Sequence, residues 1–161
     1  MESKVSSVID RLQLQPHPEG GYYREVFRSG SVVNPSDERE TRSALTSIYF
    51  LIVDGGNSRW HRLRSDEVWH FIEGAPVELL QVDGELDRLE RYVLGSATEG
   101  LEPVASVPAG AWQAARTAGS YSLVGCTVSP GFDFADFRLL ADEPQLAAVL
   151  RDRYPDLAVL I

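Results

Sequence analysis

The sequence predicts an all-β protein, an antiparallel sandwich or barrel with a short helix at each end of the chain. Short apolar or alternating runs follow one another from residue 43 to residue 140, and each is bounded by glycine, proline or an acidic turn such as Asp83-Gly84. A parallel sheet would need crossover helices between these runs, and none of the segments between them has a helical pattern. Many short strands with turns at this spacing are typical of a sandwich or barrel.

The first predicted elements are a helix and a strand. Apolar residues recur at helical spacing from Val5 to Leu12, behind serines that can cap a helix, so we expect a short amphipathic helix over residues 4–13. Residues 22–28 alternate as a strand does. Residues 29–41, rich in Ser, Asn, Pro and charge, are expected to form an exposed loop.

The central strands and the tail follow. The predicted strands span residues 43–53, 61–63, 67–72, 77–82, 86–94, 104–107, 111–116, 120–129 and 133–140. Residues 143–151 have a helical pattern, and residues 157–161 are apolar. Because an exposed apolar end is costly in water, we expect it to pack on the barrel or on a second subunit.

Length and composition exclude several classes of function. The 161 residues fit one domain, 1–161, which is large enough for a sizeable core. A net charge of −9 repels nucleic acid and anionic lipid, and no apolar run approaches the roughly 20 residues that span a bilayer. Cys126 is the single cysteine and allows no intrachain disulfide, which fits a reducing cytoplasm, so we expect a cytoplasmic protein.

One stretch carries most of the chemistry. Gly55, His61, Glu67 and Gly74 follow one another at intervals of six, six and seven residues, which suits two strands joined by a polar turn. Side chains alternate along a strand, so this spacing can present the imidazole and the carboxylate on one face. We therefore expect His61 and Glu67 to meet over one cavity, where they can share a metal or move a proton.

These residues resemble the cupins, which are small double-stranded β-helix jelly rolls. The first cupin motif contains a glycine, a pair of histidines, a glutamate and a second glycine, and its spacing matches here with Leu63 at the second histidine position. The second motif, P-x-G followed by a histidine, matches from Pro108 with Gln113 in place of the histidine. The resemblance implies a jelly roll with a short N-terminal helix and a short C-terminal helix.

Four blocks resemble, more narrowly, an uncharacterised branch of one-domain cupins close to the RmlC-like sugar epimerase fold. They are HPEGGYYRE (17–25), WHRLRSDEVWHF (60–71), VPAGAWQAA (107–115) and LVGCTVSPGFDFADF (123–137). Because cupins of this kind pair through sheet edges and terminal segments, the resemblance implies a homodimer. It implies a small-molecule ligand in the barrel without naming a reaction.

The donor set for a metal is incomplete. The resemblance implies three histidines and a carboxylate, whereas this chain offers His61, Glu67 and the amide Gln113. Divalent transition metals such as Zn, Ni, Fe or Mn prefer imidazole and carboxylate to amide, so we expect weak metal binding and assign no cofactor. A hydrogen-bonded His61 and Glu67 pair in a metal-free pocket is the alternative.

The pocket expected around these groups has mixed walls. Strand alternation puts Trp69 and Phe71 on the face of Glu67, while His70 points to the other face unless a bulge intervenes. The residues expected to contact a ligand are Gln113, Trp69, Phe71, Leu63, Tyr49 and Tyr121. The HPEGG block has two open interpretations, a plain turn between helix and strand or a lid over the barrel mouth.

Two functions are compatible with such a pocket. The first is a metal-independent or weakly metal-dependent isomerase or epimerase acting on a sugar-like or other small polar metabolite, in which Glu67 orients His61 and His61 moves a proton beside a carbonyl. The second is a noncatalytic ligand-binding or sensing module. The missing histidines argue against the metal-dependent oxygenase chemistry of other cupins.

Overall fold

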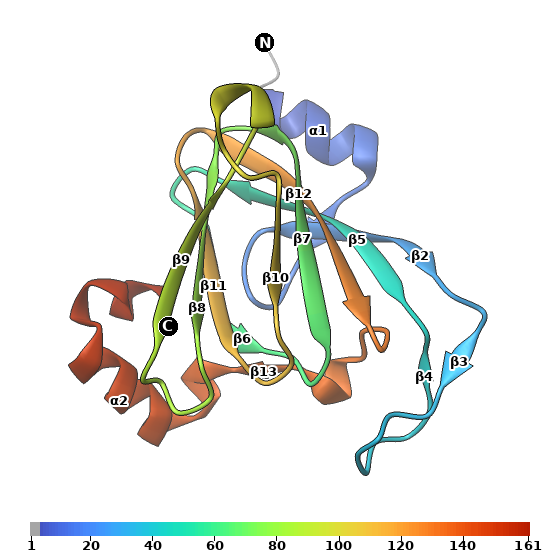
Figure 1. Cartoon of the computed structure of the whole chain (residues 1–161). Helices are drawn as coiled ribbons and strands as arrows, with labels where there is room; N and C mark the ends of the chain where they lie inside the picture. The colour runs from blue at the N-terminus through green and yellow to red at the C-terminus, as the bar shows by residue number, and fades with distance from the viewer. Residues whose placement is uncertain (1–3) are drawn as a thin grey trace.

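The computed structural model describes residues 4–161, and most of its strands form two antiparallel sheets that face each other (Figure 1). The larger sheet consists, in spatial order, of β1 (Gln15–Pro16), β2 (Tyr22–Arg28), β5 (Thr46–Val53), β12 (Tyr121–Ser129), β7 (Asp66–Gly74) and β10 (Val104–Val107). The smaller sheet consists of β13 (Arg138–Leu139), β6 (Asn57–Arg62), β11 (Trp112–Thr117), β8 (Val77–Val82) and β9 (Leu89–Leu94). A separate pair joins β3 (Val32–Val33) to β4 (Arg42–Ser43).

Consecutive strands alternate between the two sheets from β5 to β8 and again from β9 to β13. β5 and β7 belong to the larger sheet, whereas β6 and β8 belong to the smaller one. Strands distant in sequence therefore become neighbours, and β12 pairs with β5 on one side and with β7 on the other. This is the predicted double-stranded β-helix jelly roll.

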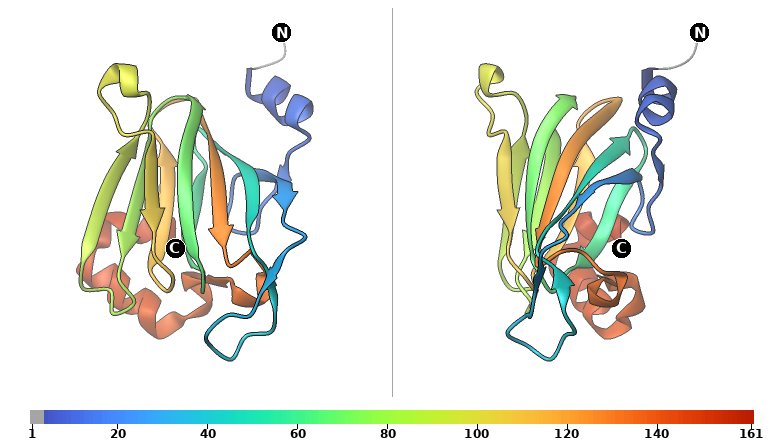
Figure 2. Two further views of the ribbon diagram at one scale, coloured as in Figure 1. Left: turned by 45° about the vertical axis from the view of Figure 1, so that its right-hand side comes forward. Right: turned by 90° about the vertical axis from the view of Figure 1, so that its right-hand side faces the viewer.

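Helical segments flank the barrel, with α1 (Lys4–Leu12) at one end and α2 (Pro144–Arg153) at the other (Figure 2). The 3-10 helices are η1 (Ala97–Glu99), η2 (Phe134–Asp136), η3 (Leu140–Asp142) and η4 (Pro155–Leu160). Both predicted terminal helices are confirmed, within two residues at each end. No helix among residues 4–161 has the length and apolar character needed to cross a membrane.

The period-two alternation of the strands sorts side chains into separate layers. In β5, Phe50 joins the core between the sheets, while the adjacent Leu51 faces the other way and packs with α1. On the smaller sheet, Trp60 and Trp112 point outward and pack with Leu150 of α2. Truncating the fully buried Leu150 to alanine would cost about 2–5 kcal/mol, because it leaves a cavity in this layer.

The apolar C-terminal end packs on the barrel, which is the first of the two predicted alternatives. Leu157 and Leu160 of η4 are buried in the same layer as α2. The indole N–H of Trp60 donates to the carbonyl oxygen of Leu157 at 3.1 Å. This hydrogen bond satisfies a buried donor and fixes the end of the chain against β6.

Three predicted strands are shorter than expected, and the one predicted over 43–53 divides into β4 and β5. The strand predicted over 86–94 begins at Leu89, because Leu86 adopts a positive φ of 59° inside a turn that Asp83 closes. The strand predicted over 133–140 reduces to β13, because the Asp133 carboxylate accepts a hydrogen bond from the Ala135 N–H and starts η2.

The predicted loop over 29–41 also departs from expectation in two ways. It contains β3, and Arg39 within it is 6% exposed at its side chain because it reaches the buried Asp136. An ion pair that the sequence pattern does not show thus draws part of a polar loop inward.

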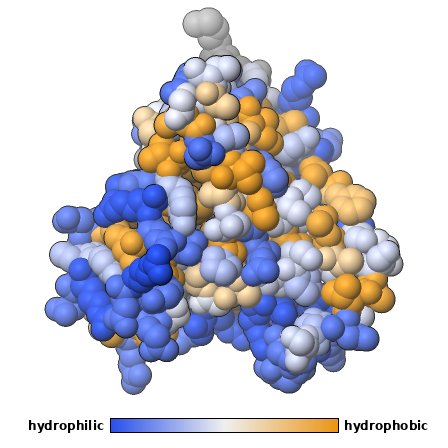
Figure 3. Space-filling view, viewed as in Figure 1, coloured by the Kyte–Doolittle hydropathy of each residue, from blue (hydrophilic) through white to orange (hydrophobic). Residues whose placement is uncertain are grey.

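The outer face of the larger sheet carries exposed apolar side chains. Hydrophobic residues gather on the surface over the region where β7 and β10 lie (Figure 3). Ile72 of β7 and Val104 of β10 are 45% and 48% exposed. Val104 pairs with His70, so Val104, His70 and Ile72 share one face of the sheet.

Candidate functional site

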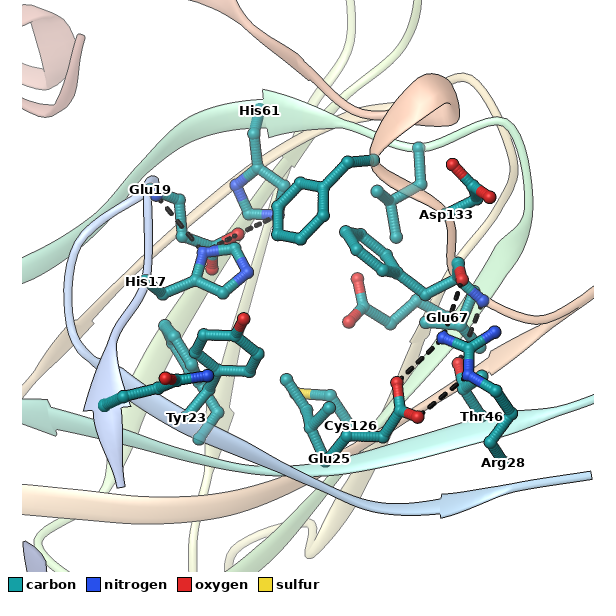
Figure 4. Close-up of a pocket in the computed structure, with 17 residues that line it drawn as sticks. His17, Glu19, Tyr23, Glu25, Arg28, Thr46, His61, Glu67, Cys126 and Asp133 are labelled. Carbon is teal, nitrogen blue, oxygen red and sulfur yellow. Dashed lines mark hydrogen bonds and ion pairs between the residues drawn. The ribbon is translucent and has the colours of Figure 1, made fainter. Parts of the chain in front are cut away.

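A cavity of about 500 Å³ opens between the two sheets (Figure 4). Its deep residues are buried, while Glu25, Arg28, Asp133 and Phe134 are exposed at its mouth. The lining residues are Gln15, His17, Glu19, Tyr23, Glu25, Arg28, Thr46, Ile48, Phe50, His61, Leu63, Glu67, Cys126, Val128, Phe132, Asp133 and Phe134. Mostly apolar walls with a few convergent polar groups are typical of a small-molecule site.

A bulge in β6 places two polar side chains on the inner face of the strand, where His61 lines the cavity and Ser58 holds Glu19. The register between β6 and β11 shifts where Gln113 pairs with His61 and Ala115 pairs with Ser58, so β6 has one extra residue in this stretch. His61 and Ser58 therefore both face inward, although strict alternation would separate them. Trp60 between them faces outward.

The HPEGG block lies along β6 and inserts Glu19 into the wall of the cavity. The Arg59 N–H donates to the Glu19 carbonyl oxygen at 2.7 Å, which holds the block against the strand. Gly20 has a φ of 104°, and a Cβ at this position would collide with the backbone oxygen of Asn57. Only glycine allows this approach. The block is the predicted turn, which leads into β2 and is closed by the bond from the Gly20 N–H to the His17 carbonyl oxygen at 3.0 Å, and it also forms a wall of the site.

Glu19 bridges two imidazoles and a hydroxyl. Its Oε1 accepts a hydrogen bond from Ser58 Oγ at 2.8 Å. Its Oε2 lies 3.2 Å from Nε2 of His61 and 3.4 Å from Nδ1 of His17. Two segments distant in sequence, the HPEGG block and β6, thus meet at one buried carboxyl group.

The hydrogen bonds indicate which ring nitrogens carry protons. His61 Nδ1 lies 2.8 Å from the Arg59 carbonyl oxygen, which only accepts, so Nδ1 carries the hydrogen and Nε2 of the neutral ring is an acceptor. Burial raises the pKa of Glu19 to about 8 and lowers the pKa of His61. Near neutral pH, a protonated Glu19 can therefore donate its O–H to Nε2 of His61.

His17 is a second imidazole that stays neutral. Burial, with a smaller contribution from the nearby His61, lowers its pKa to about 3. Its Nδ1 accepts a hydrogen bond from the Glu19 N–H at 3.2 Å. The ring packs edge-on against Tyr23 and stacks on Phe134, with centroid distances of 4.6 and 6.0 Å. His17 thus contributes shape and an acceptor, without positive charge.

Glu67 enters from the larger sheet and is held by a chain of hydrogen bonds. The Trp69 indole N–H donates to Gln113 Oε1 at 3.0 Å, and Gln113 Nε2 donates to Glu67 Oε2 at 2.5 Å. Burial raises the pKa of Glu67 to about 7, and the charge of Glu19 acts in the same direction while His61 opposes it. Glu67 is thus poised to take up or release a proton near neutral pH.

An aromatic segment closes the site beside His61. The His61 ring stacks on Phe137 with a centroid distance of 5.6 Å and an interplanar angle of 27°. This segment is anchored by Asp136, whose two carboxylate oxygens each accept a hydrogen bond from Arg42 at 3.0 Å. Arg39 adds a third bond to Asp136 at 3.3 Å.

The predicted site residues separate into three groups. His61, Glu67 and Leu63 line the cavity, whereas Gln113 and Trp69 support Glu67 from behind. Within residues 4–161 no hydrogen bond or ion pair joins His61 to Glu67; the partner of His61 is Glu19.

The remaining predicted contact residues lie elsewhere. Tyr49 and Tyr121 pack in the layer beneath α1, on the opposite face of the larger sheet, so the prediction that they contact a ligand is corrected. Phe71 faces inward as expected but packs on the core rather than on the cavity. His70 faces outward, as strand alternation predicted.

Glu19 and His17 line the cavity but were not assigned to the site by the sequence interpretation. The signal was present in the HPEGG block, where a histidine and a carboxylate precede two glycines. A pair of glycines beside a charged residue indicates that another part of the chain packs closely against this backbone. It does not identify which strand that is.

The residues present do not fit the metal centre that the motif resemblance implies. Gln113 is committed at both ends, because its oxygen accepts from Trp69 and its nitrogen donates to Glu67. Leu63 offers no donor atom at the position of the second histidine. Among residues 4–161 no three or more His, Cys, Asp or Glu side chains are grouped so that they could hold a metal ion.

Comparison with known proteins gives a consistent set of matches. Residues 6–140 match the family model described as "Cupin superfamily (DUF985)". The chain is 27% identical, over 89% of its length and 79% of the relative's, to an uncharacterised protein of Saccharomyces cerevisiae, YML079W.

Two solved structures are similar over nearly the whole chain. A hypothetical protein from Leishmania major is 35% identical with a TM-score of 0.83, covering 99% of this chain and 97% of that one. Protein SO0799 from Shewanella oneidensis is 34% identical with a TM-score of 0.81, covering 99% and 95%.

Proposed function

The chain belongs to the cupin superfamily, in the family described as DUF985, and from that premise we propose that its cavity binds a small polar carbonyl compound and transfers a proton at the carbon beside the carbonyl. This is the chemistry of an isomerase or epimerase. Sugar-like metabolites are one class of molecule with the required group. A ligand-binding module without turnover is the competing function.

One observation carries the proposal: two buried proton-carrying units face the same cavity from different sheets. The Glu19 and His61 pair stands on the side of β6, and Glu67 stands on β7. Burial raises the pKa of Glu67 to about 7 and of Glu19 to about 8, so one carboxyl group can act as base while the other still carries its proton. Acids and bases with pKa values near the working pH are the most effective at proton transfer.

The proton steps balance without any further reactant. The Glu67 carboxylate removes the proton from the carbon beside the carbonyl, and the electron pair moves to the carbonyl oxygen. The proton shared by Glu19 and His61 passes to that oxygen, which gives a neutral enol. Reversal of these transfers at the neighbouring carbon, or on the other face of the same carbon, restores both groups and yields the isomer.

This assignment differs from the sequence-based mechanism in the role of each carboxylate. Glu67 was expected to orient His61, but Glu19 contacts His61 while Gln113 orients Glu67. Phe137, stacked on His61, and Phe50, in the cavity wall, place apolar surface beside these groups, and a low local polarity strengthens electrostatic interactions.

The test is exchange of substrate hydrogen with solvent. Small aldoses, ketoses, keto acids and amino ketones are incubated with the protein in D2O, and NMR follows deuterium incorporation beside the carbonyl. Incorporation that Glu67→Gln abolishes supports the proposal. Tight binding in the cavity without incorporation would instead favour the noncatalytic module.

We also propose that the chain forms a homodimer through the outer face of the larger sheet. Val104 lies on the edge strand β10, and with Ile72 it leaves an apolar area exposed (Figure 3). Gly125 lies opposite His70 on the same face and adds no side chain, which leaves room for a partner. Light scattering at micromolar concentration should give twice the 17.8 kDa of one chain, and Ile72→Glu should give the monomer mass.

A further inference from the structure

We propose that the ligand of this cavity carries a positively charged ammonium group, which lies at the mouth beside Phe132, Phe134 and Asp133. The inference rests on the proposed function, since it names the class of molecule that the same cavity takes. It follows from which charges at the site are already paired, and from the aromatic rings around them.

The positive charge at the mouth is already neutralised. Arg28 is the single lysine or arginine among the described residues that line the cavity. Its Nε and Nη2 donate to the two carboxylate oxygens of Glu25, each at 2.8 Å, and Nη2 also donates to the Phe132 carbonyl oxygen at 3.1 Å. A bidentate pair of this kind leaves little positive charge for an anionic ligand.

The negative charge at the mouth is in excess. Asp133 lies exposed beside the opening, and its Oδ1 accepts a hydrogen bond from the backbone N–H of Ala135 at 2.8 Å. With Glu25 and Arg28 cancelling each other, Asp133 leaves the rim negative. A cation approaching the mouth is attracted and an anion is repelled.

The interior supplies no positive charge either. Burial keeps His17 and His61 in their neutral forms by lowering the pKa of each, while Glu19 and Glu67 are acids. An anion moved from water into this interior would lose its hydration without gaining a cationic partner, which is strongly unfavourable. The cavity is therefore expected to bind anionic ligands poorly.

Aromatic rings provide the surface that a desolvated ammonium group prefers. Phe132 and Phe134 meet edge to face with a centroid distance of 4.9 Å, and Phe134 also stacks on His17. Tyr23 completes the wall on the other side of His17. The negative faces of such rings attract a cation, and the neutral His17 does not oppose it.

The experiment compares three probes of nearly equal shape. Choline is cationic, 3,3-dimethylbutan-1-ol is its neutral counterpart, and 3,3-dimethylbutanoate is anionic. Calorimetry gives the dissociation constants, and amide NMR shifts of residues 132–134 report binding in the cavity. We expect choline to bind about tenfold more tightly than the alcohol, and the carboxylate to bind most weakly. Equal affinities, a preference for the carboxylate, or no choline binding at millimolar concentration would each overturn the inference.

Three variants locate the charge that selects. Asp133→Asn keeps the oxygen that caps η2 but removes the charge, so choline affinity should fall several-fold while that of the alcohol stays the same. Glu25→Gln releases Arg28 and should shift the preference toward the carboxylate. Glu99→Gln in η1, away from the cavity, is the control for total charge. If Glu99→Gln lowers choline affinity as much as Asp133→Asn does, the charge at the mouth does not determine the preference for cations, and the inference fails.

The inference and the proposed function fail separately. Deuterium incorporation into neutral or acidic carbonyl compounds, with no choline preference, would overturn the inference and keep the proton-transfer chemistry. Choline selectivity with no incorporation into any carbonyl amine would support the inference and overturn the chemistry.

Discussion

Glu19 Oε2 lies 3.2 Å from His61 Nε2, and this contact joins the HPEGG block to the cupin motif histidine. The pair is buried, and the Ser58 hydroxyl holds the other carboxyl oxygen at 2.8 Å. Glu19 and His61 can therefore share one proton only because the HPEGG block docks against β6.

Replacing Glu19 by glutamine should leave the fold intact and suppress catalysis. The amide can still occupy the space and accept from Ser58, but it cannot deliver an acidic proton to the carbonyl oxygen. Exchange in D2O should fall by about 10²-fold or more, with ligand affinity changed far less. Ser58→Ala is the matched control, since it removes one hydrogen bond worth about 1 kcal/mol and keeps the carboxyl group.

Replacing Gly20 by alanine should destabilise the protein strongly. Both its φ of 104° and the collision of a Cβ with the Asn57 oxygen oppose the native backbone. Gly100→Ala is the control, because Gly100 has a φ of 78° with open space around it. Urea titration should show a loss of about 1 kcal/mol for the control and a clearly larger loss for Gly20→Ala. Equal losses would mean that the approach to β6 is not tight.

Stability should decrease as pH rises from about 6.5 to 8. The pKa values of Glu19 and Glu67 are raised from 4.5 to about 8 and about 7, so the folded state holds protons that the unfolded state has released. Since the free energy of unfolding falls with pH wherever the folded state binds more protons, the loss spans this window.

The histidines limit where this pH effect is visible. The pKa of His17 is lowered from 6.5 to about 3, which makes stability rise with pH below 6.5 and offsets the carboxylates there. Above 6.5 the histidine contribution is constant. Urea unfolding at several pH values should therefore show a decline that Glu19→Gln reduces and Glu99→Gln does not. A rise in stability from pH 6.5 to 8 would contradict the raised carboxyl pKa values.

Replacing Asp136 by asparagine should loosen the wall beside His61. The buried carboxylate pairs with Arg42 and Arg39, and its loss leaves Arg42 without a carboxylate partner while Arg39 keeps only Asp37. We expect a loss of about 3 kcal/mol and faster cleavage by trypsin after both arginines. Asp37→Asn, at a more exposed ion pair, should cost about 1 kcal/mol or less.

Treatment with a chelator should leave proton exchange unchanged. The amide of Gln113 is committed to Trp69 and Glu67, and Leu63 brings no donor atom. Gln113→His would break that chain and add an imidazole beside His61, so its affinity for nickel or zinc should rise. Loss of exchange on chelation, restored by one metal per chain, would contradict this prediction.

The sequence by itself determined the layers of the fold and half of the site. Period-two alternation placed His61 and Glu67 toward the cavity, because a strand's geometry is local. The resemblance of the motifs to the cupins, rather than strand geometry, identified the jelly roll.

Only the tertiary structure decided which groups meet. The contact between Glu19 and His61 needs a bulge in β6, a positive φ at Gly20 and the docking of one backbone on another, none of which a single segment encodes. The alternation of side chains along a strand did not show which face of the sheet Tyr49 and Tyr121 occupy. Their packing beneath α1 determined it. Long-range pairing fixes such contacts, because their energy depends on groups that are distant along the chain and adjacent only after folding.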